Sequence, residues 1–465
     1  MRRFDILIIG SGPAGQNAAI QGAKSGRSVA LVEKERNLGG ASVHHGTIPS
    51  KTLRENALQM QGLKRHADTF QFALKKDIPI SAMMKNLDAV LKAHVDYMTQ
   101  QLSDCGVIAI HGRARFVGDH RLEVMSIDGS IEQVEAKYIV IATGSRPQDP
   151  HQIPVDHENI FDSDSILSLI YLPRTMAVLG GGAIACEYAS IFSVLGTRVT
   201  IIDQGPKPMD FLDDALIDEF VSEFEQNGGR YLGDQRIESV HLNGIGHVVT
   251  NLSSGSSMVN EKMLFALGRV ANLDSLSLKN VGLEPTMQGF LEVDQYCRTT
   301  VPHIYAVGDV SGPPALAASA MEQGRRAVCH ACGHETSTPP ENIPIGIYAI
   351  PELSSIGLSE AQAREHYGEV LVGIALFAEV ARAQIAGASG GFLKMVCHPT
   401  NLRLLGVQIA GEGATELIHL GEMGLMHHST AHFFIEGVFN FPTLAEAYRE
   451  AALSIVNQAK QKSRD

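Results

Sequence analysis

Two glycine-rich segments carry the clearest chemical signal in this sequence of 465 residues. The first is GSGPAG at residues 10–15, which follows a short apolar run and precedes a run with helical periodicity. Such a loop is typical of a dinucleotide site: Gly10 allows a tight turn, Gly12 lets the backbone approach a pyrophosphate, and Gly15 lets helix and strand pack closely. The helix would direct its N-terminus at the phosphates, and Glu33, which ends the next apolar run, would bind a ribose hydroxyl.

The second glycine segment is GGGAIA at residues 180–185, again between two apolar runs. Gly180 and Gly182 occupy the first two glycine positions, and Ala185 replaces the third, which relaxes the packing of helix on strand. The second run ends at Asp203, an acid that can bind a ribose hydroxyl. We therefore predict two dinucleotide sites, one for a bound flavin and one for an exchanging nicotinamide nucleotide. The alternative is one functional site and one decayed copy.

The elements that position these loops alternate between strand and helix, which predicts an α/β fold with two doubly wound, Rossmann-like units. Strands that end in small-residue turns, 138–147 and 264–272, mark the entry to the second unit and the exit from it. The segment 298–312 then predicts a strand that ends at Gly308-Asp309, and a helix over 315–332 follows. We therefore expect the second unit to be inserted into the first. The expected domains are 1–148 with 271–340 (FAD), 149–270 (NAD(P)) and 341–465 (interface).

The remaining segments fill this plan. Residues 52–105 carry helical patterns, and 107–140 predict a β-meander with a hairpin turn at Asp128-Gly129. The Pro-rich stretch 336–346 predicts a linker. Beyond it, strands such as FLKMVCH and then helices predict an α+β domain without a glycine fingerprint. A domain of this kind is typical of a subunit interface, so we expect a homodimer or larger homo-oligomer.

Composition narrows the partners and the location. Lys+Arg minus Asp+Glu is 38 − 51 = −13, which argues against nucleic acid as a partner. No apolar run reaches the ~18 residues that span a bilayer, and the apolar run in MRRFDILIIG is too short for a signal peptide. The 6 cysteines suggest no secreted disulfide framework. We expect a cytoplasmic protein that does not bind a membrane.

Several further motifs share one family pattern. They are GSGPAG (10–15), GGASVHHGTIPSK (39–51), ATGSRP (142–147), GGGAIACEYASIF (180–192), ALGR (266–269) and VGD (307–309). With them, the chain resembles the flavoprotein disulfide reductases over essentially its whole length. The resemblance implies an FAD domain, an NAD(P) domain and a C-terminal dimer-interface domain.

The resemblance breaks at the redox chemistry of the family. Ser42 and Thr47 stand where the family carries its redox-active cysteines, and Phe441 stands where it carries an acid–base histidine. A hydroxyl cannot replace a thiolate in disulfide exchange, so thiol chemistry at the flavin is excluded. The simplest remaining chemistry is hydride transfer between NADP(H) and NAD(H) through flavin N5. The runs HHGTIPSK, CEYASIF and FNFPTLAEAYREAAL are similar to a transhydrogenase subgroup of the family.

The resemblance also implies roles for single residues. Lys51 would lie beside flavin N5 and pair with Glu187, stabilising the reduced flavin; the alternative is a surface pair with Glu55 at i,i+4. Asp309 would accept a hydrogen bond from the ribityl chain, and the helix beginning near Ala317 would point at the flavin pyrimidine. The implied FAD-binding residues are Gly10, Gly12, Gly15, Glu33, Gly39, Gly40, Ser42, Thr47, Lys51, Ala142, Thr143, Gly144, Asp309 and Ala317. The implied NAD(P)-binding residues are Gly180, Gly182, Ala185, Glu187, Asp203, Gly268 and Arg269.

Other reactive side chains have ordinary alternatives. His44 and His45 lie inside the flavin loop and could contact the flavin or donate a proton; the alternative for each is a structural or solvent-facing role. Cys329 and Cys332 form a CxxC pair, but no second pair accompanies it and it ends a helix, where thiol pKa values are not lowered. We therefore expect neither a redox pair nor a metal site there.

The nucleotide preference separates the functional hypotheses. Asp203 favours the free 2′-hydroxyl of NAD(H), whereas a transhydrogenase also takes NADP(H). Lys207 lies nearby in sequence and could bind the 2′-phosphate or be a solvated loop charge. The alternative enzyme is an NADH-dependent diaphorase or oxidase. The alternative outside enzymes is a non-catalytic flavoprotein scaffold or sensor.

Overall fold

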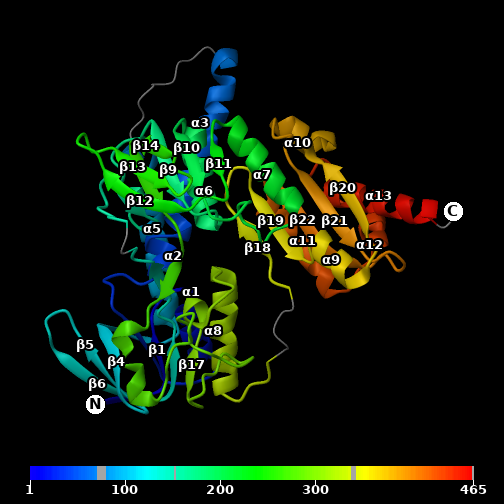
Figure 1. Ribbon diagram of the computed structural model, residues 1–465. Coiled ribbons are helices and arrows are strands. Elements are labelled where there is room, and N and C mark those ends of the chain that lie inside the picture. Colours follow the sequence, from blue (N-terminus) through cyan, green and yellow to red (C-terminus); the bar gives the residue numbers. More distant parts are fainter. Residues whose placement is uncertain (71–79, 151–152, 337–341, 463–465) are drawn as a thin grey trace.

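The structure is a computed structural model that describes residues 1–70, 80–150, 153–336 and 342–462. Three large sheets organise this part of the chain, and each lies in its own region of the molecule (Figure 1). The first is at the bottom of the view, the second at the upper left, and the third at the right. The mixed α/β fold expected from the sequence is confirmed.

The first sheet runs in the order β3-β2-β1-β6-β5-β4. Strand β17 also pairs with β6, outside this order. Its strands are β1 (Arg2–Ile9), β2 (Val29–Glu33), β3 (Ile108–His111), β4 (Arg113–Gly118), β5 (Arg121–Met125), β6 (Ile131–Ile141) and β17 (Ile304–Ala306). Ile6 and Ile8 of β1 pack toward the helices α1 (Pro13–Lys24) and α8 (Ala317–Ala331). Leu7 and Ile9 are buried on the opposite face. A parallel strand buried on both faces reads as a continuous apolar run, which explains the segment FDILII.

The second sheet is parallel throughout and has the order β11-β10-β9-β15-β8. Its strands are β8 (Ile160–Asp162), β9 (Thr175–Leu179), β10 (Arg198–Ile202), β11 (Arg230–Leu232) and β15 (Lys262–Phe265). Helix α6 (Ala183–Leu195) follows the second glycine loop and has buried side chains on every side. It lies between the sheet and helix α3 (Thr47–Phe70), which comes from the first part of the chain. We call the parts of the chain built on the first, second and third sheets the first, second and third units, so one apolar core joins the first unit to the second.

The third sheet is antiparallel, in the order β18-β19-β22-β21-β20. Its strands are β18 (Ile345–Ile347), β19 (Leu353–Gly357), β20 (Leu371–Leu376), β21 (Phe392–Cys397) and β22 (Leu404–Ala410). Helices α11 (Ala414–Met426), α12 (Ala431–Glu436) and α13 (Glu446–Lys462) cover one face with an apolar core. Helix α7 (Asp214–Gln226) of the second unit packs on the other face. Through that face, the third unit therefore contacts helix α7 of the second unit.

The remaining helices and strands connect or cover these sheets. They are α2 (Gly40–His44), α4 (Ile80–Met83), α5 (Leu87–Asp104), β7 (Ser145–Pro147), β12 (Ile237–Leu242), β13 (Val248–Leu252), β14 (Ser257–Asn260), β16 (Arg269–Ala271), α9 (Glu360–Tyr367) and α10 (Ala381–Ala386). None of the helices among the described residues combines the length and the apolar character that a membrane crossing requires.

Two sequence predictions need correction. The meander expected over 107–140 begins only at β4, because β3 instead pairs in parallel with β2 as an edge of the first sheet. The strand expected to run through 298–312 as far as Gly308-Asp309 is limited to β17, and a 3₁₀ turn at Gly308–Ser311 follows it. The hairpin at Asp128-Gly129 and the helix after Ala317 are confirmed. The predicted linker 336–346 lies partly outside the described residues.

Gly324 supplies a test of how closely α1 and α8 pack. A Cβ at Gly324 would lie 2.1 Å from the carbonyl oxygen of Ala14, whereas a Cβ at Gly62 in α3 would meet nothing within 4 Å. Alanine favours an exposed helix by about 1 kcal/mol over glycine. We therefore expect Gly62→Ala to raise the thermal midpoint, and Gly324→Ala to lower it by forcing the helices apart, at a cost of about 1–3 kcal/mol. Scanning calorimetry measures both, and a raised midpoint for Gly324→Ala would contradict this packing.

Candidate functional site

Both glycine loops face one cavity of about 1550 Å³. Typical sites for small ligands measure roughly 300–1000 Å³, so the cavity has room for more than one ligand of that size. It is lined from all three units, including Tyr348 and Thr415 of the third. The residues that we predicted for the site all line it except Gly15, Gly39 and Ala185. Those three residues lie behind the wall.

In the first glycine loop, each glycine has a different neighbour. Gly10 has a φ of 105°, and a Cβ there would lie 2.3 Å from the carbonyl oxygen of Ala142. A Cβ on Gly15 would lie 1.9 Å from the carbonyl oxygen of Gly10, so only glycine lets α1 approach the strand. A Cβ on Gly12 would meet nothing within 4 Å, because that position opens into the cavity. The open position is where a pyrophosphate needs to approach the backbone.

Glu33 holds the same loop from the end of β2. Its Oε2 accepts hydrogen bonds from the backbone N (2.9 Å) and the Oγ (2.6 Å) of Ser11, and its Oε1 accepts from the backbone N of Glu35 at 2.9 Å. Ser11 Oγ in turn accepts from Gly39 N at 2.9 Å. Ser11 was not among the predicted site residues, although it lies between the first two glycines of the loop at residues 10–15. It connects Glu33 to the second glycine pair.

The segment after that pair carries the positions of the missing cysteines. A Cβ on Gly40 would lie 2.9 Å from the Cα of Gly12, so glycine allows the two loops to touch. Ser42 on α2 and Thr47 at the start of α3 both line the cavity. Within the described ranges, no cysteine lines it. The wall therefore offers hydroxyls in place of thiols.

The two loop histidines differ. His44 Nε2 lies 2.8 Å from the carbonyl oxygen of Leu38, a hydrogen bond that fixes the turn before α2. His45 ends α2 and has an exposed side chain on the cavity wall. The structural role weighed for histidine in this loop thus suits His44, and the solvent-facing role suits His45.

Lys51 lies at the junction of the three units. Its Nζ is 2.7 Å from Glu187 Oε2, across the contact between α3 and α6. Glu187 Oε1 accepts a hydrogen bond from the backbone N of Tyr348 at 2.8 Å. Lys51 Nζ also lies 4.8 Å from the centroid of the Tyr348 ring. The lysine thus pairs with Glu187 rather than with Glu55.

The second glycine loop repeats the plan of the first. Gly180 has a φ of 105°, and a Cβ there would lie 2.7 Å from the carbonyl oxygen of Ala266. A Cβ on Gly182 would meet nothing within 4 Å. Ala185 is fully buried at the third position. The alanine is accommodated while the second position still opens into the cavity.

Asp203 lies against this loop. A Cβ on Gly181 would be 2.5 Å from its Oδ2, which also lies 3.3 Å from both Gly205 N and Tyr231 Oη. Burial and the neighbouring Asp203 carboxylate raise the pKa of Tyr231. Lys207 forms an ion pair with Asp214 at 2.8 Å. The carboxylate therefore faces the cavity, while the lysine is engaged elsewhere.

A polar chain crosses the cavity wall between the two nucleotide units. Asp309 accepts a hydrogen bond from Ser145 Oγ at 2.5 Å, and Ser145 Oγ accepts from Arg269 Nε at 2.8 Å. Arg269 Nη1 lies 3.1 Å from Asp164 Oδ1. Arg269, which the family resemblance assigns to NAD(P), thus also connects the units to each other. The neighbouring Gly268 has a φ of 127° and lines the cavity.

Two buried hydroxyls on the wall lack protein partners. Thr143 Oγ1 and Tyr188 Oη make no hydrogen bond among the described residues, and both residues line the cavity. Buried polar groups are nearly always paired, so these two fit a polar ligand. Ala142, Gly144 and the N-terminal end of α8 at Ala317 line the same wall. A helix N-terminus favours negative charge, which suits phosphates or an anionic ring.

Phe441 lies apart from this wall. The residue is 67% exposed, and it does not line the cavity of its own chain. Within the described ranges, no three His, Cys, Asp or Glu side chains lie together in a way that could hold a metal ion.

Comparisons with known proteins agree with this geometry. The family described as "Pyridine nucleotide-disulphide oxidoreductase" matches residues 4–324, and its "dimerisation domain" matches residues 343–452. The chain is 41% identical to the soluble pyridine nucleotide transhydrogenase of Mycobacterium tuberculosis over 99% of this chain and 98% of that protein. It is 40% identical to that of Chromohalobacter salexigens over 98% and 99%.

Solved structures give the same picture. The crystal structure of LpdA from Mycobacterium tuberculosis has a TM-score of 0.90 at 26% identity and covers 97% of this chain and 99% of that chain. The flavoprotein disulfide reductase RclA from Escherichia coli has a TM-score of 0.87 at 25% identity, with the same coverage.

The fold and the cavity thus define an oxidoreductase with two nucleotide-binding units around one site. The chain belongs to the pyridine nucleotide-disulphide oxidoreductase family. Its curated relatives at about 40% identity are transhydrogenases.

The burial of the cysteines predicts which thiols of the native protein react with an alkylating reagent. Burial raises the pKa of Cys297 to about 11 and that of Cys397 to about 12, and it raises the pKa of Cys186 and Cys329 as well. We therefore expect N-ethylmaleimide near neutral pH to modify the native protein only at the half-buried Cys105 and Cys332. Peptide mass spectrometry reads the positions, and denatured protein, in which all 6 cysteines react, is the control. Rapid labelling of Cys186 would contradict the buried arrangement.

Proposed function

We propose that this chain is an FAD-dependent pyridine nucleotide transhydrogenase that moves a hydride from NADPH to NAD+ without a thiol step. One observation carries the proposal: a single cavity joins both glycine loops, and the Lys51–Glu187 pair lies on its wall where no described cysteine does. The identity to curated transhydrogenases supports it.

FAD is the group that the first nucleotide unit would hold. The open position at Gly12, the unpartnered hydroxyl of Thr143 and the N-terminal end of α8 suit its pyrophosphate, polar groups and ring. Glu33 keeps the loop in shape through Ser11 and can still accept from a ribose hydroxyl. When bound, FAD would supply the chemistry of reversible hydride transfer.

The residues of the chain would position the cofactor and stabilise its reduced ring. Lys51, held by Glu187 and lying over the Tyr348 ring, keeps a positive charge on the cavity wall. Such a fixed charge stabilises an anionic ring without reorganisation at the moment of transfer. His44 already forms a hydrogen bond with the carbonyl oxygen of Leu38, so His45 is the loop histidine that could contact a ligand.

The second nucleotide unit would bind NAD(H) and NADP(H) in turn at Gly180, Gly182 and Asp203. The Asp203 carboxylate suits a free 2′-hydroxyl and repels a 2′-phosphate, and Lys207 is paired with Asp214. This observation favours a second candidate function, an NADH-dependent diaphorase or oxidase.

We further propose the division into 1–148 with 271–340, 149–270 and 341–465. The pairing of β17 with β6 and the antiparallel pair of β7 with β16 support an insertion between those strands. The match of residues 343–452 to a dimerisation domain supports a homodimer. A cytoplasmic location is part of the same proposal, in keeping with the soluble relatives.

Anaerobic nucleotide exchange tests the function. Purified holoprotein mixed with NADPH and thio-NAD under nitrogen should reduce thionicotinamide steadily, because the reaction needs no acceptor other than a second nicotinamide. Absorbance of the reduced thionicotinamide is the measurement. NADH consumption that requires air, with no exchange, would support the diaphorase instead. Flavin that bleaches with neither nucleotide would support a non-catalytic flavoprotein.

Lys51→Met tests the role of the wall charge. The change removes the cation beside Glu187 but keeps most of the length of the side chain, so we expect hydride transfer to slow by about a hundredfold and the flavin reduction potential to fall. Stopped-flow reduction by excess NADH and a potential titration measure the two effects. Lys64→Met, on the same helix but outside the cavity, is the matched control. If Lys51→Met transferred hydride as fast as Lys64→Met and the wild type, this role for Lys51 would be ruled out.

A further inference from the structure

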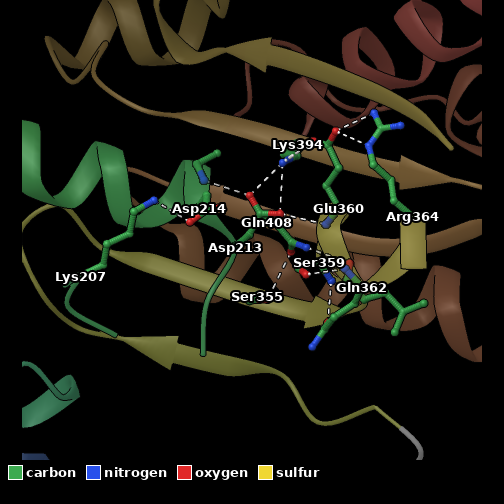
Figure 2. A network of polar contacts seen from close by, with 12 residues as sticks. Lys207, Asp213, Asp214, Ser355, Ser359, Glu360, Gln362, Arg364, Lys394 and Gln408 are labelled. Atoms are coloured by element: carbon green, nitrogen blue, oxygen red, sulfur yellow. Dashed lines mark hydrogen bonds and ion pairs between the residues drawn. The ribbon is translucent and has the colours of Figure 1, made fainter. Parts of the chain in front are cut away.

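A buried lysine links the third unit to the second nucleotide unit. Lys394 Nζ lies 2.8 and 3.1 Å from the two carboxylate oxygens of Asp213, and 2.8 Å from Glu360 Oε2 (Figure 2). Lys394 is 5% exposed and Asp213 is 4% exposed. Lys394 lies on β21, Asp213 precedes α7, and Glu360 begins α9, so three separate segments meet at one ammonium group.

The charges in this network balance. Arg364 donates to Glu360 from the solvent side, so two cations face two carboxylates. Burial alone would raise the pKa of Glu360, but the hydrogen bonds from Lys394 and Arg364 outweigh it, and the pKa lies below its usual range. A buried ion pair of this kind adds little net stability, yet removing one partner is costly because it leaves an unpaired buried charge. This ion pair therefore contributes more to the relative position of β21, α7 and α9 than to net stability.

The Lys394 contact continues to the nucleotide site through the chain. Asp213 also caps α7, since its Oδ1 accepts from Ala215 N at 3.0 Å. It ends the loop that begins at Asp203. Between them, Met209 N donates to the carbonyl oxygen of Gly181, in the second glycine loop, at 2.8 Å. The loop is therefore held to the glycine loop at Met209, in its second half, and to Lys394 at its end, Asp213.

We propose that Lys394 is a positioning residue for the second nucleotide site: by holding Asp213, it fixes the loop 203–213 and with it the ribose-facing carboxylate of Asp203. The inference rests on the proposed function only in assigning a nicotinamide nucleotide to this site. Lys394 touches neither nucleotide nor flavin, because it does not line the cavity. It acts through Asp213.

Lys394→Met tests the proposal in the holoprotein. The change keeps most of the length of the side chain and leaves Asp213 buried without a cation. We expect the dissociation constant for NAD+, which cannot reduce the oxidised flavin, to rise by about tenfold in calorimetry, with unchanged flavin content and flavin spectrum. In turnover, KM for the nucleotide should rise more than kcat falls. A purely structural role would lower the thermal midpoint without moving the dissociation constant.

Two further variants sharpen the result. Arg364→Met breaks the outer ion pair of Glu360 but leaves Lys394 on Asp213, so NAD+ should bind as in the wild type. Asp213→Asn keeps a cap for α7 and weakens the pairing with Lys394, so it should weaken NAD+ binding in the same direction as Lys394→Met. It also replaces Lys394→Met if that protein fails to fold.

The outcomes separate the two proposals. Wild-type affinity for NAD+ in folded Lys394→Met, or in folded Asp213→Asn, overturns the positioning role whatever reaction the enzyme performs. If the wild-type protein binds NAD+ but NADPH transfers no hydride to thio-NAD, the transhydrogenase proposal fails, while the effect of Lys394 on affinity still stands or falls by the calorimetry.

Discussion

The ion pair between Lys51 and Glu187 requires all three units of the chain to be in place. Lys51 comes from a helix that follows the first glycine loop, Glu187 from the helix that follows the second, and the backbone N of Tyr348, which also binds Glu187, from the third unit. An ion pair of partly buried charges depends steeply on distance and on burial. The packing of these units on one another therefore sets the 2.7 Å between Lys51 Nζ and Glu187 Oε2.

That packing is both apolar and polar. Helix α6 is buried on every side, and the apolar core around it includes Leu53 and Ala57 of α3 as well as Ile350 beside the third sheet. Apolar contact holds surfaces together but is not directional. The directional part comes from pairs such as Lys394 with Asp213, where hydrogen-bond geometry allows one relative orientation. The network in Figure 2 therefore complements the core around α6.

Hydride exchange places a different demand on this scaffold from disulfide exchange. Disulfide exchange needs a thiolate at the cavity, whereas Ser42 and Thr47 offer hydroxyls there. Cysteines elsewhere, such as Cys186 and Cys397, are buried with raised pKa values and act as small apolar side chains. The features that remain are those a cofactor enzyme needs: open glycine positions, a fixed cation, and two cavity-wall hydroxyls without a hydrogen-bond partner among the described residues.

The sequence by itself determined the glycine loops, their strands and the absence of thiols at the site, because these depend on residue type and on spacing over a few residues. It left open whether Lys51 pairs with Glu55 or with Glu187, and it predicted the second only from a resemblance. It also gave no sign that Lys394, inside an apolar strand, binds Asp213, 181 residues away. Only the tertiary structure decided these pairs, because the energy of a charge depends on its burial and its neighbours, and long-range packing sets both.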